Sequence, residues 1–346
     1  MDHQQWSLRF GASVLVCALL LRLGTTGFFQ PVAEFLAQPH IASFLIYLET
    51  GRIVRFSQSS EVQEVFANES ATPDFALRQN TEPPPEVEEP TIPSFAAADV
   101  SGVKIKNSAG LKVSMKKLIV QPLQWDLTTE EPAVLILHTH ATESYTRVSG
   151  EKYKESAAFR TLNEKYNMIS VGDHLAQLLE EAGIHVLHDR KTHDYPSYNG
   201  SYTNARKSIE KYLKKYPSIC MVLDLHRDAS GDLKNQMRTK ATVDGKKSAQ
   251  IMFVVGTNGA GQKHPNWKEN LALALKLQVQ MERHAKGICR NINLRSQRFN
   301  QDESTGALIV EVGAAGNTRQ EALIAVEVLA AAIKDLSHGA LTGGGT

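Results

Sequence analysis

The chain has 346 residues, enough for one or two domains with a sizeable core, and it carries 38 Lys and Arg against 37 Asp and Glu. A formal net charge of +1 provides no general attraction to nucleic acid, so we expect no nucleic-acid partner. The three cysteines are too few and too scattered for a disulfide framework, and none lies beside a histidine in a zinc-finger spacing.

Residues 1–30 are predicted to form a membrane-directed segment. Phe10 to Leu21 contains no charge, then Arg22 interrupts, and apolar residues resume as far as Phe29. The uninterrupted part has the length of a signal-peptide core, whereas the whole segment can span a membrane if the long stem of Arg22 reaches the interface. Because no small-residue cleavage site follows directly, we favour an uncleaved anchor, with the bulk of the chain outside, over a cleaved signal.

Two further segments precede the globular part. Residues 31–56 contain a second apolar stretch with charged residues around it, which predicts an amphipathic juxtamembrane segment. Residues 57–99 lose hydrophobic periodicity, and Thr81 to Pro90 is acidic and proline-rich. Such a composition does not bury enough apolar surface to fold, so we predict a disordered linker that holds a domain at a distance from the membrane.

Residues 100–338 alternate between short apolar runs and amphipathic stretches, which predicts one α/β domain with a mostly parallel or mixed sheet and flanking helices. The expected strands lie at 103–106, 111–113, 118–120, 134–137, 184–187, 218–225 and 307–312. The expected helices lie at 171–182, 202–216, 267–284 and 320–336. Asp244 and Gly245 predict the turn of a hairpin whose strands are residues 239–243 and 248–255. The glycine-rich residues 339–346 are expected to be a disordered tail.

Three of the expected strands end in side chains that bind zinc or transfer protons. These are, in chain order, His138, His140 and Glu143, then His226, Arg227 and Asp228, and then Glu311. In an open α/β sheet, sites form outside the carboxyl ends of the strands, and parallel strands bring those ends to one edge. We therefore expect a metal site at this edge.

Zinc in a hydrolytic site takes three protein ligands and keeps one position for water. We assign His140, Glu143 and His226 as the ligands. His138 is the alternative to His140, because both face one site in an extended chain and only one does so if the chain turns. Glu311 is then the general base, which takes a proton from the attacking water and delivers it to the leaving nitrogen, with its pKa raised by an apolar strand.

Neighbouring side chains are expected to complete the site. Asp228 is expected to orient a ligand imidazole. Arg227 is expected to stabilise an oxyanion or bind a substrate carboxylate, with a structural ion pair as the alternative. The tyrosines and asparagines of the loop before residue 202 line a groove for sugar or peptide, or else pack as ordinary turn residues. The substrate-binding candidates are Tyr145, Tyr198, Asn199, Tyr202 and Asn317.

Five blocks of the chain resemble the stage II sporulation protein P family. They lie, in family order, at 138–145 (HTHATESY), 171–173 (VGD), 193–202 (HDYPSYNGSY), 224–228 (DLHRD) and 308–313 (LIVEVG). The resemblance runs from about residue 103 to residue 333. The DLHRD and NGSY blocks are its specific parts, and the N-terminal anchor with its linker also fits the family.

The resemblance implies a fold similar to the zinc-dependent N-acetylmuramoyl-L-alanine amidases, with Zn²⁺ as cofactor and peptidoglycan as substrate. It implies cleavage of the bond between the lactyl group of muramic acid and L-Ala, and also of peptide cross-links, during engulfment in endospore formation. It implies stage II sporulation proteins D and M as partners. The implied location is membrane-anchored, with the catalytic domain in the extracytoplasmic septal space around the forespore.

Three alternatives stay open at the level of sequence. Glu164 precedes a helix much as the ligand glutamate of the wider amidase fold does, although Glu143 lies in the more specific block and is favoured. A cell-wall metallopeptidase or deacetylase would use the same ligands. A non-catalytic scaffold of the engulfment machinery would have lost its metal, but the full set of histidines and carboxylates favours an enzyme.

Overall fold

The computed structural model describes residues 92–342, with the exception of residues 124 and 233. The expected anchor, the amphipathic segment and most of the expected linker lie outside these residues. Within the part of the chain that is described, no helix is both long enough and apolar enough to cross a membrane.

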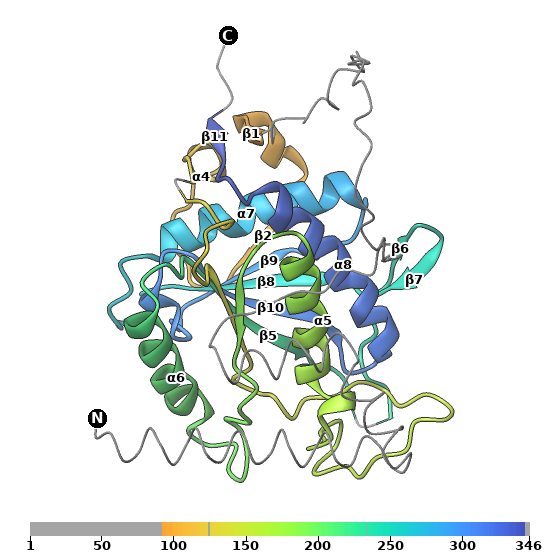
Figure 1. Ribbon diagram of the computed structural model, residues 1–346. Helices are drawn as coiled ribbons and strands as arrows, with labels where there is room; N and C mark the ends of the chain where they lie inside the picture. The colour runs from red at the N-terminus through yellow and green to blue at the C-terminus, as the bar shows by residue number, and fades with distance from the viewer. Residues whose placement is uncertain (1–91, 124, 233, 343–346) are drawn as a thin grey trace, which may run out of the picture. The chain divides into compact units, whose positions relative to one another are not determined.

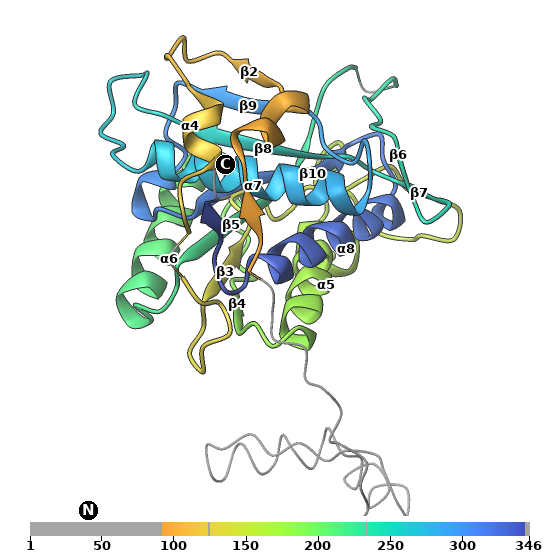
Figure 2. The same ribbon diagram turned by 90° about the horizontal axis from the view of Figure 1, so that it is seen from above.

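Seven strands form the central sheet, in the order β2-β9-β8-β10-β5-β3-β4, and Figure 2 shows them in this order from top to bottom. Only β8 and β10 pair antiparallel; the other neighbours are parallel, so two parallel blocks of opposite direction meet there. The mostly parallel mixed sheet is therefore confirmed. The strands are β2 Ile105–Asn107, β3 Val134–Leu137, β4 Val186–His188, β5 Met221–Asp228, β8 Ile251–Gly256, β9 Ile292–Arg295 and β10 Ala307–Ala314.

Helices cover both faces of the sheet (Figure 1). Three of them pack on one face over the large core, and the fourth covers a smaller core on the other face. The three are α5 Met168–Glu181, α7 Trp267–His284 and α8 Arg319–Asp335, and the fourth is α6 Ser201–Lys215. The sequence predicted all four helices to within three residues at each end, because each has a continuous apolar stripe.

The alternation of β3 decides where the first histidine after it points. Val134 and Ile136 belong to the core under α5, whereas Leu135 and Leu137 belong to the core under α6. His138 continues the first series and is fully buried. Its Nδ1 lies 3.1 Å from the carbonyl oxygen of Leu225, and its Nε2 lies 2.8 Å from Nε2 of His188. Burial, together with His188, lowers the pKa of His138 to about 3.

Two expected strands are not strands. Residues 111–113 are irregular, and residues 118–120 fall at the end of helix α4, Met115–Ile119. Met115, Leu118 and Ile119 recur at i, i+3 and i+4, which is the spacing of a helical apolar face, and Leu118 and Ile119 are buried. This run therefore follows the period of a helix and not that of a strand.

The predicted hairpin is present but shorter than expected. β6 Ala241–Val243 pairs with β7 Lys246–Ser248 around Asp244 and Gly245. The chain then leaves the hairpin, and residues 251–256 enter the central sheet as β8. Every residue of β8 is buried, and only a strand covered on both faces can bury such a run.

The ordered domain extends beyond residues 100–338. β1 Ser94–Phe95 pairs in parallel with β11 Leu341–Thr342, so both ends of the domain meet in a two-stranded sheet. Phe95 is fully buried in the large core. The last residues of the expected linker and the first residues of the expected tail are therefore part of the fold, because Phe95 supplies an apolar anchor that the linker composition concealed.

Gly172→Ala is expected to lower the free energy of unfolding by about 1–3 kcal/mol. A Cβ at this position of α5 would lie 2.6 Å from Nε2 of His138 and 2.5 Å from Nε2 of His188. The measurement is urea denaturation. Gly102→Ala is the control, because a Cβ there meets nothing within 4 Å. Equal stability of the two variants would show that the buried histidine pair moves aside without cost.

Candidate metal centre

A turn after β3 separates the two histidines of the first block. The chain turns at residues 139–142. The Thr139 amide and hydroxyl donate hydrogen bonds to the carboxylate of Asp224, at 2.7 and 2.6 Å, and hold the turn against β5. His138 remains under α5, whereas His140 lies over the edge of the sheet. Only one of the two histidines therefore reaches the site, and it is His140.

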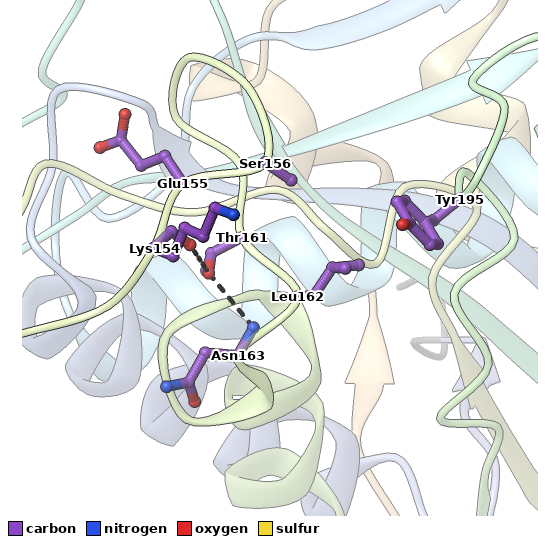
Figure 3. A pocket seen from close by; sticks show the side chains of 7 residues that line it. All are labelled: Lys154, Glu155, Ser156, Thr161, Leu162, Asn163 and Tyr195. Atoms are coloured by element: carbon purple, nitrogen blue, oxygen red, sulfur yellow. Dashed lines mark hydrogen bonds between the residues drawn. The ribbon is translucent and has the colours of Figure 1, made fainter.

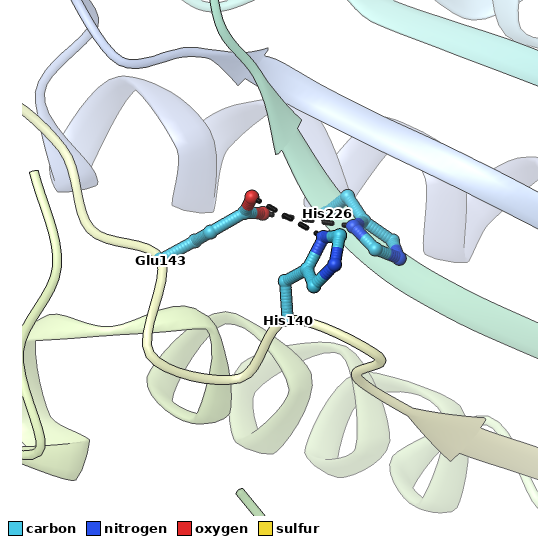
Figure 4. Close-up of side chains that lie close together, drawn as sticks. All are labelled: His140, Glu143 and His226. Atoms are coloured by element: carbon cyan, nitrogen blue, oxygen red, sulfur yellow. Dashed lines mark ion pairs between the residues drawn. The ribbon is translucent and has the colours of Figure 1, made fainter. Parts of the chain in front are cut away.

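His140, Glu143 and His226 converge at this edge, as Figure 4 shows. Nδ1 of His140 lies 3.6 Å from Oε1 of Glu143, and Nδ1 of His226 lies 3.6 Å from Oε2. All three residues are buried. One donor atom from each lies within 4.8 Å of the other two.

These separations fit a metal ion better than they fit hydrogen bonds. A separation of 3.6 Å is too long for a hydrogen bond between nitrogen and oxygen. Ligands that lie about 2.0–2.2 Å from one zinc ion in tetrahedral geometry are roughly 3.4 Å apart. Two imidazoles and one carboxylate also form a donor set that zinc prefers. His140, Glu143 and His226 are therefore the residues that would hold the ion.

Glu164, the alternative ligand, lies elsewhere. Its side chain is half exposed and pairs with Arg190 at the surface. Arg190 in turn contacts Asp173, whose carboxylate also lies 3.0 Å from Nδ1 of His188. Glu143 is thus the carboxylate that the structure places beside the two histidines.

Asp224 supports His226 and was missed in the sequence. Its Oδ1 lies 2.9 Å from Nε2 of His226, while the same carboxylate holds Thr139. Residues two apart on a strand face the same side, so the D-x-H spacing was the available signal. Asp228, which was expected to orient an imidazole, instead accepts a hydrogen bond of 2.7 Å from Arg290.

The charges of the three residues depend on one another. Burial opposes ionisation of His226, but Asp224 and Glu143 outweigh it and raise the pKa of His226 well above its usual value. Burial likewise opposes ionisation of Glu143, yet Arg227 and His226 bring the pKa of Glu143 down to about 2. Burial and His226 lower the pKa of His140 to about 4. A metal ion would displace the proton that His226 carries.

Glu311 lies beside this cluster on the neighbouring strand. In the register of β10 with β5 it is paired with His226. Its Oε2 is buried and has no hydrogen-bond partner among the described residues. Burial raises the pKa of Glu311 to about 8; Glu143 adds to the shift, and His226 opposes it. An unpartnered carboxyl with a pKa near neutrality is suited to proton transfer.

Arg227 holds the backbone around the site. Its Nε donates to the carbonyl of Ser144 at 3.0 Å, and its Nη2 donates to the carbonyl of Phe159 at 2.9 Å. Its Nη1 lies 3.5 Å from Oε1 of Glu143, and the residue is only 6% exposed. The contacts of Arg227 therefore favour the structural role, in which it pairs with Glu143 and holds two backbone carbonyls.

Two of the substrate-binding candidates are buried. Tyr145 is 3% exposed and donates its hydroxyl to the carbonyl of Val312 at 2.8 Å. Asn317 is fully buried; its Oδ1 accepts hydrogen bonds from the backbone amides of Thr239 and Ala314, both at 3.0–3.1 Å. Neither side chain faces a groove, because each satisfies backbone groups inside the fold.

Two of the other three candidates, Tyr198 and Tyr202, lie at the mouth of the site. Tyr198 is 54% exposed, and its ring stacks on His140 with centroids 4.6 Å apart. Tyr202 meets His140 edge-on at 5.6 Å. Asn199 follows Tyr198 and is exposed. The tyrosine-bearing loop, residues 193–200, thus forms an aromatic wall beside one proposed ligand.

A hollow of about 470 Å³ opens between this loop and residues 154–163, as Figure 3 shows. Tyr195 and Leu162, both about half exposed, supply its apolar surface, and Lys154 and Asn163 are among its polar lining residues. An apolar wall with a polar rim is typical of a binding surface.

Comparison with known proteins gives a family. The family described as Stage II sporulation protein P (SpoIIP) matches residues 53–334. Stage II sporulation protein P of Bacillus subtilis (strain 168) is 29% identical over 206 residues, which are 56% of this chain and 48% of the relative. The match therefore spans about half the length of that relative.

Solved amidase structures show a partial likeness. N-acetylmuramoyl-L-alanine amidase AmiC2 of Nostoc punctiforme is 12% identical, with 58% of this chain and 94% of that chain covered, at a TM-score of 0.36. The N-acetylmuramoyl-L-alanine amidase from Clostridium difficile 630 is also 12% identical, with 60% and 97% covered, at a TM-score of 0.37. Such values carry no conclusion about the chemistry of this site, which depends on its own geometry.

Glu311→Gln is expected to stabilise the metal-free protein at pH 8 and to leave its stability unchanged near pH 4. The pKa of Glu311 is about 8 in the folded chain and 4.5 ordinarily, so the folded chain holds the proton more tightly. The contribution of the protonated Glu311 to stability is complete below about pH 4.5 and is lost as the pH rises through 8. Glutamine does not ionise and loses nothing.

The free energy of unfolding of Glu311→Gln should exceed that of the wild type by at least about 1 kcal/mol at pH 8. It is measured by urea denaturation in the presence of a chelator from pH 4 to pH 9. A constant difference across this range would contradict the raised pKa.

Proposed function

Because this chain belongs to the stage II sporulation protein P family, we propose that it is a zinc-dependent peptidoglycan hydrolase acting in engulfment during endospore formation. The bond we propose it cleaves is the amide between the lactyl group of muramic acid and L-Ala, with peptide cross-links as a further substrate. One observation supports the chemistry above all others: His140, Glu143 and His226 converge beside Glu311, whose buried Oε2 has no partner among the described residues.

His140, Glu143 and His226 would hold the ion. A zinc ion held there would act as a Lewis acid, which would polarise the amide carbonyl and lower the pKa of the attacking water. Asp224 keeps His226 in place through its contact with Nε2. This contact leaves Nδ1, which lies toward Glu143, as the nitrogen available to a metal.

Glu311 serves as the base and then as the acid. Its carboxylate takes a proton from the attacking water as oxygen bonds to the carbonyl carbon, and it delivers that proton to the nitrogen of L-Ala as the carbon–nitrogen bond breaks. A pKa near 8 suits Glu311 to donating a proton. A cation nearby would lower this pKa toward neutrality, so that the ionised form, which accepts the proton, would also be populated.

The exposed wall next to the site suits a polymer. Tyr198 presents an aromatic face at the mouth, Asn199 follows it as an exposed residue, and the hollow beside Tyr195 lies along the same loop. A substrate that extends beyond the cleaved bond needs such a surface on an open edge of the molecule.

Family membership also motivates the cellular part of the proposal. We place the catalytic domain outside the cytoplasm, held by a membrane anchor in residues 1–30, in the septal space around the forespore. Stage II sporulation proteins D and M are the proposed partners.

The deciding experiment measures zinc content and analyses the products of peptidoglycan digestion by mass spectrometry, using residues 92–346. Release of free stem peptides only by the zinc-loaded protein is the expected result. Bound zinc with products deacetylated or cut within the peptides would indicate the rival enzyme classes. Absence of both zinc and product would favour the scaffold.

His226→Ala is expected to abolish zinc binding and hydrolysis, because it removes one of three ligands and the partner of Asp224. Zinc is measured by equilibrium dialysis. His185→Ala is the control, since His185 lies at the surface and pairs with Glu180. Stoichiometric zinc in the His226 variant would remove it from the ligand set.

Glu311→Gln is expected to keep zinc and to lower turnover by about 10²–10⁴-fold, because the variant cannot carry the proton. Glu327→Gln is the control, since Glu327 is exposed and, within the described residues, forms an ion pair with His174 alone. Turnover near that of the wild type would exclude Glu311 as the base.

A further inference from the structure

Residues 159–161 lie beyond the metal-site turn in the sequence, and they pair with residues 142–144 like a short strand. The Ser144 amide donates to the carbonyl of Phe159 at 2.9 Å, and the Thr161 amide donates to the carbonyl of Thr142 at 2.8 Å. These two bonds flank the antiparallel bridge between Glu143 and Arg160. In this type of pair the two side chains lie close together on one side of the ribbon.

The guanidinium of Arg160 contacts the proposed ligand and a second carboxylate at once. Its Nη2 donates to Oε1 of Glu143 at 3.2 Å, and its Nη1 donates to Oδ2 of Asp194 at 2.6 Å. Nη1 also donates to the hydroxyl of Thr142 at 3.1 Å. The side chain of Arg160 is 19% exposed and that of Asp194 is fully buried. Ion pairs this well shielded from water fix geometry more firmly than surface pairs do.

The same guanidinium reaches the aromatic wall. Its Cζ lies 4.9 Å from the centre of the Tyr198 ring, and that ring stacks on His140. Asp194 belongs to the tyrosine-bearing loop and also accepts a hydrogen bond of 2.5 Å from the hydroxyl of Thr142. One side chain therefore contacts a proposed ligand, the loop at the mouth of the site, and the ring that covers a second ligand.

We propose that Arg160 is a positioning residue that orients Glu143 for the metal and ties it to the tyrosine-bearing loop. This inference rests on the proposed function. Arg227 differs from Arg160, because two of its hydrogen bonds hold backbone carbonyls. The hydrogen bonds of the Arg160 guanidinium go to the side chains of Thr142, Glu143 and Asp194.

The role requires arginine rather than any cation. A guanidinium is planar and presents donors in a fixed fork, so it can bind two carboxylates while its face lies over a ring. A lysine ammonium keeps the charge but not this geometry. Arg160→Lys therefore separates positioning from charge compensation.

Arg160→Lys in the full chain is expected to weaken zinc binding by about 10–100-fold, the usual loss when a partner of a metal ligand is removed. Affinity is measured by competition with a chromogenic chelator. Arg147→Lys is the matched control, because Arg147 lies on the same loop, pairs with exposed Glu155 and packs over Tyr153 at 4.2 Å. The control should bind zinc as the wild type does, and the melting temperatures of the two metal-free variants should agree within a few degrees.

At saturating zinc, the KM of Arg160→Lys for peptidoglycan fragments should rise more than kcat falls, because Tyr198 loses the planar guanidinium beside its ring while Glu311 is untouched. A variant that only loosened the fold would not separate the two constants in this way. Equal KM values for Arg160→Lys and Arg147→Lys would overturn the link to the tyrosine-bearing loop.

Asp194→Asn removes the charge of the carboxylate that pairs with Arg160. It therefore tests the role of Arg160 independently, and it still does so if Arg160→Lys does not fold. It should weaken zinc binding several-fold, although Asp194 is outside the proposed ligand set. The double variant should lose little more than Arg160→Lys alone, because both changes break one network. Unchanged affinity in Asp194→Asn, or fully additive losses, would overturn the proposal.

The outcomes also separate this inference from the function on which it rests. A wild-type protein that binds no zinc would refute the proposed function. A wild-type protein that binds zinc, with Arg160→Lys indistinguishable from Arg147→Lys, would refute the role of Arg160 and leave the proposed function standing.

Discussion

The site depends on the contacts of one buried group, the carboxylate of Asp224. It accepts hydrogen bonds from the amide and hydroxyl of Thr139 and lies 2.9 Å from Nε2 of His226. A buried carboxylate without such partners would cost several kcal/mol. Satisfying it ties the turn after β3 to the end of β5, and that tie brings His140 and His226 together. The metal-type cluster is a consequence of how one buried charge is compensated.

Charge compensation also gives Glu143 and Glu311 opposite characters, although both lie near His226. Glu143 is surrounded by Arg160, Arg227 and two imidazoles, and it stays ionised with a pKa of about 2. Glu311 has no hydrogen-bond partner for its Oε2 among the described residues, and its pKa rises to about 8. Two carboxylates a short distance apart thus suit different roles, one as ligand and one as proton carrier.

The parts of the fold that followed from sequence are those with a long, unambiguous period. α7 begins and ends where its apolar stripe predicted, and Asp244 and Gly245 do form a hairpin turn. Short apolar runs were less informative: residues 118 and 119 proved helical, and β9 was not foreseen. Phe95 lies in a composition typical of a linker, yet it is buried. In each of these cases the partner that decides the outcome is far away in the chain.

The sequence alone determined the chemistry available at the sheet edge, because residue types at the ends of apolar runs are local information. It placed His140, Glu143, His226 and Glu311 at the ends of strands, which a parallel sheet brings to one edge. The tertiary structure decided which groups meet. The turn at 139–142 turned His140 toward the site and left His138 in the core, and Tyr145 and Asn317 proved to be buried. Asp224 was missed although its place two residues before His226 offered a signal. Arg160 was found only in the structure, because its role arises from contacts between segments that no local pattern encodes.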